Sequence, residues 1–500
     1  MNVENFLRHW SIRENPFKAE EAREDPVYLR IMDSEMTHPD FEKIYGSPDH
    51  PGTSVVFGEK GSGKTATRLL IEERLRQYNE EHPEQKVWIA RHDDLNPMLD
   101  SIVAHSKSDS SEALKSITIG DHMDALLALI TTRVIDFLTG DDLDVDKPRK
   151  RRRQLRKMPY PSRLDLAALT MLYDQRKTGN PMSRWNQTLT KLRVGRMLNI
   201  RALLWTSLVV LVAAGCATAA GYIHEPWKWQ LFTTSGAGFA VGLAGLYYWF
   251  TQAVRAGKLA RKLDREVRAV DRTHGLLKKQ IGDLPLKELE PLPLPLTGNE
   301  DSRYDLIVRL RQILEHMGYA SLVVLLDRVD EPALVNGQPG KMRSIIWPML
   351  NNKFLQQDGV GFKLLLPIEL RHLLRREDED FFQKARLDKQ NMIDRLVWSG
   401  STLYDICNKR LAGCLDSGSS INKLTDLFEA EVTTDDVIEA LDQMKQPRDA
   451  FKFLYRVLQE HCHSAADENP EWRIAKSVLD NVRRQEAQRV QDLYRGLTPA

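Results

Sequence analysis

A glycine-rich octapeptide and a distant acidic motif carry the residue types of greatest chemical interest in this chain. The octapeptide GEKGSGKT runs from Gly58 to Thr65 and directly follows the apolar residues 54–57. Glycines at this spacing let the backbone turn so that successive N–H groups point inward at an anion. A helix that begins at the same place adds its partial positive charge. The motif therefore predicts a phosphate-binding loop between a strand and a helix.

The two residues that end this loop could act on a nucleoside triphosphate. Lys64 is placed to reach the β- and γ-phosphates, and the Thr65 hydroxyl is placed to bind Mg²⁺. We therefore expect ATP or GTP as the ligand, together with Mg²⁺. A glycine-rich turn without a ligand is the alternative, and the amphipathic pattern of the following residues 66–78 disfavours it. The loop residues expected at the nucleotide are Gly58, Gly61, Ser62, Gly63, Lys64 and Thr65.

The acidic motif follows a second apolar run, residues 322–326. Such a run reads as a buried parallel strand that delivers the next residue, Asp327, to the carboxyl edge of a sheet. We expect Asp327 to support Mg²⁺ from its second coordination sphere, next to Thr65. Asp330 or Glu331 could orient and deprotonate the attacking water, and the sequence does not choose between them. A core strand followed by a polar turn is the alternative.

Between the two motifs lie two long stretches without a charged residue. They cover residues 202–223 and 229–254, which are 22 and 26 residues long. Each exceeds the roughly 20 residues that a helix needs to cross about 30 Å of hydrocarbon. Aromatic residues gather at their ends, as at a lipid–water interface. We expect a transmembrane hairpin that turns at 224–228. Two buried core helices of a soluble domain are the alternative.

The residues around the hairpin predict its orientation and its packing. Basic residues precede it at 191–201 and follow it at 255–265, whereas the turn holds one Lys and one Glu. Both termini and the nucleotide-binding domain are therefore expected in the cytoplasm, on a cell (inner) membrane protein with two spans. Gly238 and Gly242 have a spacing that lets helices approach closely. They could pack the hairpin on itself, or pack neighbouring protomers into a homo-oligomer.

The acidic motif and the order of the segments resemble known families. The apolar run followed by Asp-x-apolar-Asp-Glu at 327–331 resembles the Walker B motif of the STAND and NACHT group of P-loop NTPases. In that group the last carboxylate is often assigned to water activation. The order of phosphate loop, membrane hairpin and acidic strand is similar to the KAP group. The usual KAP form has Asp-Asp before the apolar residue and Arg after the last Asp, so we describe the chain as KAP-like or STAND-like.

The resemblance implies further site residues. Glu369 follows the apolar strand expected at 361–367, where related ATPases place a polar sensor near the γ-phosphate. Arg448 follows a proline at a helix start and resembles the second sensor of AAA+ and STAND proteins, in which the arginine contacts nucleotide. Arg410 could act as an arginine finger across a protomer boundary. A polar strand end and an exposed helix start are the plain alternatives for Glu369 and Arg448.

The rest of the chain offers weaker signals. Asn15-Pro16-Phe17 resembles the start of some AAA+ and origin-recognition-like ATPases, and 1–53 reads as a lead-in that packs on the nucleotide-binding domain. Further strands are expected at 86–90 and 396–398. Eight of the eleven residues 147–157 are Lys or Arg, and they could bind anionic lipid or nucleic acid, or form a solvated loop.

Composition sets broad limits. The net charge of +1 gives no reason to expect a polyanion-binding protein, and the four cysteines lack metal-ligand spacing, which fits a reducing cytosol. The N-terminus lacks the apolar core of a cleaved signal peptide. We find no nuclease, TIR or protease constellation, so the effector is expected to be the hairpin or a separate protein.

The expected fold is an α/β P-loop NTPase, a parallel sheet flanked by helices, with an inserted two-helix transmembrane hairpin and a C-terminal all-helical lid. We expect a membrane-anchored ATPase that works as a nucleotide-controlled switch, and the resemblance suggests bacterial stress or anti-phage defence. The alternatives are a non-hydrolysing membrane scaffold that recruits a partner and a membrane-tethered nucleic-acid ATPase. The expected segments are 1–53 (lead-in), 54–140 (first part of the core), 141–200 (basic and helical), 201–254 (hairpin), 255–300 (membrane-proximal helix and Pro-rich linker), 301–411 (second part of the core) and 412–500 (lid).

Overall fold

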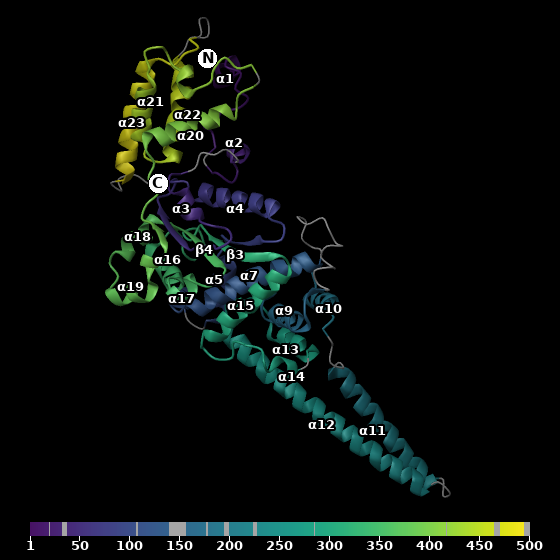
Figure 1. Cartoon of the computed structure of the whole chain (residues 1–500). Coiled ribbons are helices and arrows are strands. Elements are labelled where there is room, and N and C mark those ends of the chain that lie inside the picture. Colours follow the sequence, from purple (N-terminus) through teal and green to yellow (C-terminus); the bar gives the residue numbers. More distant parts are fainter. Residues whose placement is uncertain are drawn as a thin grey trace. The chain divides into compact units, whose positions relative to one another are not determined.

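The chain forms two compact units (Figure 1). The sheet unit comprises Met1–Asp94 and Ala320–Ala500, and the helical unit comprises Leu95–Tyr319. The phosphate loop and the acidic motif therefore belong to one unit. The computed structural model describes residues 1–19, 21–32, 38–106, 109–139, 157–176, 179–194, 200–223, 228–284, 286–416, 418–464 and 471–494.

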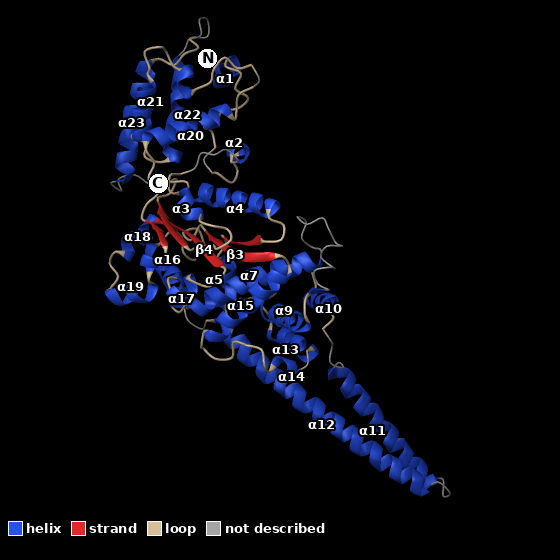
Figure 2. Cartoon of the chain, in the orientation of Figure 1, coloured by secondary structure: helices blue, strands red, loops and turns tan. Residues whose placement is uncertain are grey.

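The sheet unit is built on a five-stranded parallel sheet with the order β2-β3-β4-β1-β5 (Figure 2, red). Every residue of β1 and of β4 is buried, as the continuous apolar runs predict. β4 lies between β1 and β3, with Val56 opposite Leu365 and Val324 opposite Phe362. The expected α/β sheet is confirmed, and its order is consistent with a P-loop-like fold. The strands are β1 (Ser54–Gly58), β2 (Lys86–His92), β3 (Tyr319–Leu326), β4 (Val360–Pro367) and β5 (Asn391–Ile393).

The fifth strand differs from the sequence prediction. We expected it at 396–398, whereas β5 is Asn391–Ile393 and pairs with β1. Asn391 and Met392 are only partly buried, so their pattern does not resemble a core strand. Val397 is 63% exposed, and Trp398 turns its indole toward the phosphate loop instead.

Helix α4 (Lys64–Glu81) covers the sheet with an apolar face. Its residues Leu70, Ile71 and Leu75 pack in one cluster with buried strand residues such as Val56 and Leu365. The short helix α3 (Phe41–Tyr45) adds Phe41 and Ile44 to the same cluster. Burial of side chains of this size stabilises the fold by about 1.5–3 kcal/mol each. The packing fixes α4, and with it the phosphate loop from which α4 begins.

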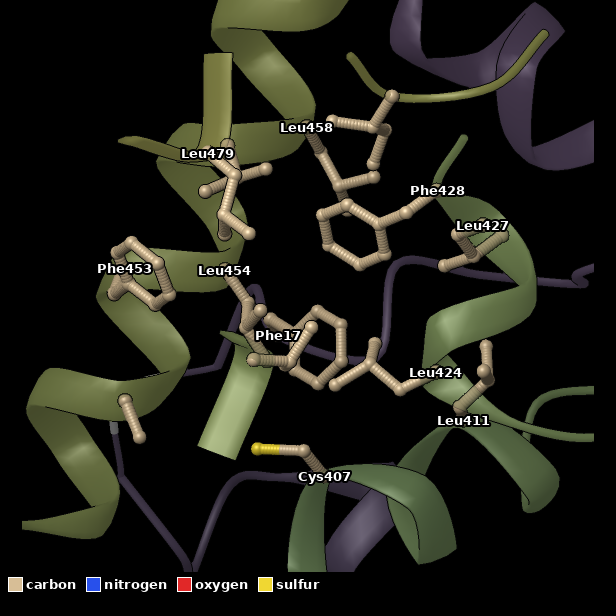
Figure 3. Packing of buried hydrophobic residues seen from close by; sticks show 14 of the residues in the cluster. Phe17, Cys407, Leu411, Leu424, Leu427, Phe428, Phe453, Leu454, Leu458 and Leu479 are labelled. Carbon is tan, nitrogen blue, oxygen red and sulfur yellow. The ribbon is translucent and has the colours of Figure 1, made fainter. Parts of the chain in front are cut away.

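The C-terminal helices form a second core together with the N-terminal segment. Phe6, Trp10 and Phe17 belong to this cluster, and Figure 3 shows Phe17 among side chains of the C-terminal helices. The Trp10 indole donates a hydrogen bond of 3.0 Å to the Trp472 carbonyl. We expected the lead-in to pack on the nucleotide-binding domain. This holds for α3, whereas α1 packs on the C-terminal helices. These helices are α20 (Gly400–Ala412), η4 (Leu424–Leu427), α21 (Thr434–Asp442), α22 (Pro447–Ser464) and α23 (Lys476–Tyr494).

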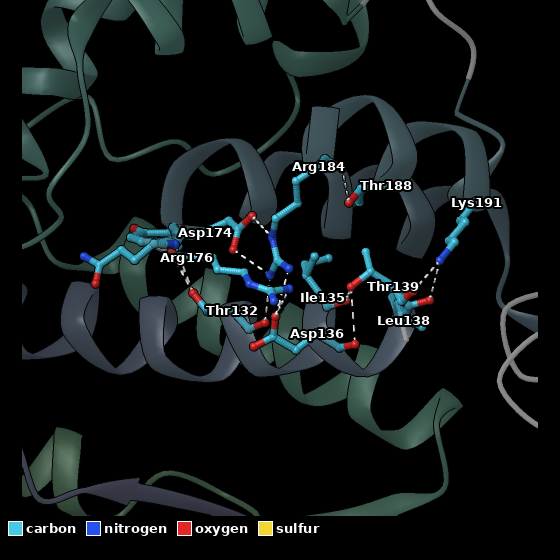
Figure 4. A network of polar contacts seen from close by, with 12 residues as sticks. Thr132, Ile135, Asp136, Leu138, Thr139, Asp174, Arg176, Arg184, Thr188 and Lys191 are labelled. Carbon is cyan, nitrogen blue, oxygen red and sulfur yellow. Dashed lines mark hydrogen bonds and ion pairs between the residues drawn. The ribbon is translucent and has the colours of Figure 1, made fainter. Parts of the chain in front are cut away.

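The helical unit is held together by partly buried ion pairs as well as apolar packing. Arg184 donates to Asp174 at 2.7 Å and to Asp136 at 2.8 Å, which ties α10 to the end of α9 and to α7 (Figure 4). Lys191 donates at 2.9 Å to the carbonyl of Thr139, which ends α7. A cation at a helix C-terminus is favourable because the last carbonyls carry partial negative charge. These contacts hold three helices in a fixed arrangement.

Helices α11 (Ile200–Ile223) and α12 (Lys228–Glu266) lie side by side as a hairpin that extends from the other helices of their unit (Figure 1). Many of their large apolar side chains face outward. Among the described residues one helix stretch, Leu203–Ala220 of α11, is long and apolar enough to cross a membrane, and 11% of it is buried. The exposed apolar residues are Trp205, Leu208, Val209, Val212, Trp229, Phe239, Val241, Leu243, Tyr247, Tyr248, Phe250 and Val254.

The small residues of α12 face α11. A Cβ atom added at Gly242 would lie 2.6 Å from Leu211 Cγ, and one added at Gly245 would lie 2.3 Å from Ser207 Oγ. At Gly238 the added atom would lie 3.0 Å from Ala214 Cβ. The glycines therefore pack the hairpin on itself, which was one of the two alternatives that the spacing left open.

The remaining helices complete the two units. In the sheet unit, α17 and α18 contact β4. The remaining helices of the sheet unit are α1 (Val3–His9), α2 (Pro26–Ile31), α16 (Pro339–Ile346), η2 (Trp347–Met349), α17 (Asn352–Leu355), α18 (Ile368–Leu374), α19 (Glu379–Ala385) and η3 (Leu387–Lys389). Those of the helical unit are α5 (Asn96–His105), α6 (Ser110–Lys115), α7 (Ile119–Thr139), α9 (Tyr160–Tyr173), α10 (Pro181–Leu192), α13 (His274–Asp283), α14 (Leu286–Leu289) and α15 (Asp301–His316).

Candidate nucleotide-binding site

The phosphate loop has the backbone that its glycines predict. Gly61 and Gly63 have φ values of +95° and +91°, a region that side-chain-bearing residues rarely adopt. Gly63 stands at the N-cap of α4, and Lys64 is the first helical residue. Because glycine brings no capping side chain, the first N–H groups of the helix remain available to an anion.

Lys64 lies inside the loop that precedes it. Its ammonium group donates hydrogen bonds of 2.7 Å to the Gly58 carbonyl and 2.9 Å to the Glu59 carbonyl. Burial lowers the pKa of Lys64, and the nearby carboxylates of Asp327, Asp330 and Glu369 oppose that shift. Carboxylates that follow β3 and β4 therefore act electrostatically on Lys64, the residue that the loop motif assigns to the β- and γ-phosphates.

Thr65 and Asp327 meet directly. The Thr65 hydroxyl donates to Asp327 Oδ2 at 2.9 Å, and Asp327 Oδ1 accepts from the backbone N–H of Arg328 at 2.9 Å. Asp327 is 1% exposed. Burial raises its pKa, whereas the Thr65 hydroxyl, Arg68 and Lys64 act to lower it.

This pair fits Mg²⁺. Mg²⁺ prefers oxygen ligands and is usually held by one or two protein groups together with substrate phosphates and water. Since the Thr65 hydroxyl donates its proton to Asp327, a lone pair of its oxygen remains for a cation. Among the residues that the structure describes, no three His, Cys, Asp or Glu side chains gather as a metal site. The Thr65–Asp327 pair, beside the phosphate loop, would hold the ion together with the nucleotide.

Two segments contact the loop: residues 395–398, which precede α20, and residues 446–448, at the start of α22. The Trp398 indole donates to the Ser62 carbonyl at 2.9 Å, and the backbone N–H of Arg448 donates to the Gly61 carbonyl at 3.4 Å. Gln446 donates to the Glu59 carboxylate, which also pairs with Arg395 at 2.6 Å. Four residues beyond β4 therefore contact Glu59, Gly61 and Ser62 of the phosphate loop.

These elements enclose a cavity of about 480 Å³ within the sheet unit. Its size falls in the range of small-molecule sites. Aromatic side chains also line it, among them Tyr28, His38, Trp398 and Phe451. The predicted site residues that line it are Gly61, Gly63, Lys64, Thr65, Asp327, Asp330, Glu331, Glu369, Arg410 and Arg448.

Two predicted residues have contacts that bear on their expected roles. Arg410 is 2% exposed, pairs with Asp25 at 2.5 Å and donates to the Pro16 carbonyl at 2.7 Å. In this arrangement its guanidinium contacts groups of its own chain. The Glu331 side chain is 49% exposed and pairs with Arg328 at 2.5 Å.

Sequence reasoning missed several residues of the site. Trp398 and Gln446 contact the loop from more than 300 positions away, and no local pattern signals them. Arg68 could have been found, because it lies one helical turn after Lys64 and so faces the same side. Two predictions lie outside the described residues: the basic run at 147–157, apart from Lys157, and the hairpin turn at 224–227.

Comparisons with protein-family models, with curated proteins and with solved structures find no match to this chain. The assignment of a function therefore depends on the geometry of the site.

Proposed function

We propose that this protein is a membrane-anchored ATPase that works as a nucleotide-controlled switch on the cytoplasmic face of a membrane. The observation that carries the proposal is the hydrogen bond of 2.9 Å between Thr65 and Asp327 beside a glycine-rich loop. A phosphate loop, a Lys-Thr pair and a strand-end carboxylate that meet in one cavity are the parts that phosphoryl transfer to water requires. The resemblance to STAND and KAP proteins extends the proposal to bacterial stress or anti-phage defence.

The hydrolytic roles follow from position. Lys64 would pair with the β- and γ-phosphates, and Thr65 with Asp327 would hold Mg²⁺, which supplies charge neutralisation when bound. Asp330 and Glu331 both line the cavity, and we assign the water-orienting role to Asp330 because the Glu331 carboxylate is engaged by Arg328. Catalysis by such a site depends on positioning and electrostatics rather than on covalent chemistry.

The contacts from the C-terminal side support a switch. Trp398 and Arg448 touch the carbonyls of Ser62 and Gly61, the loop residues whose N–H groups would bind phosphate. A phosphate that reorients this loop would change both contacts. Glu369 and Arg448, which line the same cavity, are the candidate sensors of the γ-phosphate. The helices α20 to α23 would then respond to the state of the nucleotide.

Membrane anchoring is proposed for the hairpin. Gly238, Gly242 and Gly245 of α12 face α11, and large apolar residues are exposed on both helices. Exposed apolar patches of this kind mark interaction surfaces rather than ordinary solvent-facing helices. Basic residues on both flanks and the charge-free stretches between them fit a bilayer entered and left from the cytoplasmic side.

The catalytic part is tested with purified full-length protein in detergent. We expect the wild type to bind and hydrolyse ATP with Mg²⁺, Lys64→Ala to lose binding, and Lys384→Ala, an exposed lysine on α19, to behave as wild type. Asp330→Asn should bind but turn over at least 100-fold more slowly, and Glu331→Gln should be affected less. A wild type that binds no ATP analogue, or a Lys64→Ala variant that still binds, would falsify the proposal.

The alternatives are outcomes of the same experiment. A wild type that binds ATP or GTP but turns over no faster than Asp327→Ala would be a nucleotide-binding scaffold. A nucleic-acid ATPase requires DNA or RNA affinity that disappears when the basic residues of 147–157 are neutralised. The membrane part is tested by replacing residues 202–254 with a short Gly-Ser linker: the wild type should float with lipid vesicles, and the shortened chain should not.

A further inference from the structure

Arg68 is a buried cation that no nucleotide-contacting role explains. It lies on α4 one turn after Lys64, is 3% exposed, and is not among the residues that line the cavity. Its Nε lies 3.6 Å from Asp327 Oδ2, the same oxygen that accepts the Thr65 hydrogen bond. The guanidinium therefore approaches the same carboxylate oxygen as the Thr65 hydroxyl.

The guanidinium is held at its other end as well. Its Nη1 lies 3.3 Å from Glu72 Oε2 and 3.9 Å from Asp93 Oδ2. Each of these carboxylates has a second arginine partner: Arg91 pairs with Glu72, and Arg23 pairs with Asp93. The planar guanidinium is thus fixed between α4, the end of β2 and the end of β3.

Stability alone does not account for such a group. A buried ion pair can usually be replaced by apolar residues of similar volume at no cost in stability, and often with a gain. The neighbouring face of α4 is filled by Leu70, Ile71 and Leu75. An arginine at position 68 instead places a fixed positive charge against the one carboxylate that contacts Thr65.

We propose that Arg68 is a positioning residue that fixes the Asp327 carboxylate so that the Thr65 hydroxyl keeps its oxygen lone pair free for Mg²⁺. This inference rests on the proposed function, since it assigns a task within the same site. Asp327 Oδ1 accepts a hydrogen bond from the Arg328 N–H, and Oδ2 accepts one from the Thr65 hydroxyl. The Arg68 Nε lies 3.6 Å from Oδ2, which is an ion-pair distance without a hydrogen bond. Without the charge of Arg68, the Thr65 hydrogen bond alone would restrain Oδ2, and the carboxylate could rotate away from it.

The test separates Mg²⁺ dependence from nucleotide affinity. Full-length wild type and Arg68→Gln are titrated with trinitrophenyl-ATP in EDTA and at rising Mg²⁺, and the melting temperature of each is recorded. Mg²⁺ should increase the affinity for trinitrophenyl-ATP, and the Mg²⁺ concentration that gives half of this increase should be about 10-fold higher in Arg68→Gln than in the wild type. The affinity for trinitrophenyl-ATP in EDTA should be the same in both proteins. Arg68→Lys keeps the positive charge but loses the planar guanidinium with its several donors. Its Mg²⁺ dependence should lie between those of the wild type and Arg68→Gln. Arg76→Gln, 60% exposed on the same helix, is the matched control and should behave as wild type.

Each outcome is decisive. Equal Mg²⁺ dependence of wild type and Arg68→Gln overturns the inference, and so does a parallel loss of affinity with and without Mg²⁺, which marks a structural role only. If Arg68→Gln does not fold, Arg68→Lys carries the comparison, and a wild-type Mg²⁺ dependence in that variant overturns the inference. A wild type that binds no nucleotide in either condition overturns the proposed function itself, and this inference with it.

Discussion

The hydroxyl of Thr65 and the carboxylate of Asp327 lie 2.9 Å apart although 262 positions separate them in the sequence. Between them the chain leaves the sheet unit after β2, forms the whole helical unit, and returns in β3, which neighbours β2 in the sheet. Parallel strands need a long crossover, so an insertion at this point enlarges a connection that the sheet already requires. The two halves of the site can therefore form without distortion by the inserted unit.

Gly61 should be intolerant of any side chain. Its φ is +95°, and a Cβ atom added there would lie 2.9 Å from Arg448 Cβ. Gly61→Ala must therefore strain the loop or displace Arg448, at a cost of about 1–3 kcal/mol. We expect trinitrophenyl-ATP affinity to fall about 10-fold or more. Gly340→Ala, where a Cβ atom would have nothing within 4 Å, is the control and should leave affinity unchanged. Equal affinities for the two variants would contradict the prediction.

Trp398 should report on the phosphate loop. Its indole donates to the Ser62 carbonyl at 2.9 Å, and its ring meets His38 edge-on at 4.7 Å. We expect nucleotide binding to change the tryptophan fluorescence of the wild type and Trp398→Phe to abolish most of that change. Loss of the hydrogen bond should also cost about 1 kcal/mol of stability. Trp347→Phe, in which the replaced ring lies outside the cavity, should retain the signal. A full signal in Trp398→Phe would show that the loop and this ring are not coupled.

The sequence predicted those parts of the molecule that local chemistry determines. Continuous apolar runs predicted β1, β3 and β4, because a parallel strand buried on both faces needs apolar residues throughout. Glycine and Lys-Thr spacing predicted the loop, because few other residues can adopt φ values near +90°. The prediction of the fifth strand at 396–398 was wrong. Asn391 and Met392 of β5 pair with β1 but are only partly buried, so this short strand lacks the continuous apolar run of a core strand.

The parts that tertiary packing determines could not be predicted. Trp398 contacts Ser62 across 336 positions, and Gln446 contacts Glu59 across 387. Local sequence pattern does not indicate that either residue contacts the loop, although Gln446 directly precedes Pro447 and Arg448. The spacing of Gly238 and Gly242 indicated a close helix contact but not its partner, because both packing on α11 and packing on another protomer require the same small residues. Only the arrangement of α11 and α12 distinguishes the two.

The hairpin should depend on the glycines of its inner face. At Gly242 a Cβ atom would lie 2.6 Å from Leu211 Cγ, whereas at Gly236 it would have nothing within 4 Å. Gly242→Val should therefore force α11 and α12 apart and lower stability by about 1–3 kcal/mol. Gly236→Val carries the same change in helix propensity on the same helix and serves as the control. Thermal unfolding followed by circular dichroism in detergent measures both. Indistinguishable melting curves would mean that the helices do not pack as described.

Lys363 should make the stability of the sheet unit depend on pH. This β4 residue is 1% exposed, donates to the Gly52 carbonyl at 2.8 Å, and burial lowers its pKa to about 7. An unfolded lysine has a pKa of about 10.4. Between these two values the unfolded chain binds a proton that the folded chain does not, so the free energy of unfolding should rise with pH. The rise should be about 1.4 kcal/mol per pH unit at most, and below pH 7 it should level off because both states are then protonated.

The measurement compares wild type with Lys363→Met, which removes the titrating group from the same buried position. Melting temperatures of the full-length proteins in detergent are recorded from pH 6 to pH 9. We expect the difference, wild type minus variant, to stay constant up to about pH 7 and then to increase with pH. Groups that titrate elsewhere affect both proteins equally and cancel in this difference. A difference that stays constant throughout, or that decreases with pH, would contradict the prediction. It would mean that Lys363 remains protonated in the folded protein over this pH range.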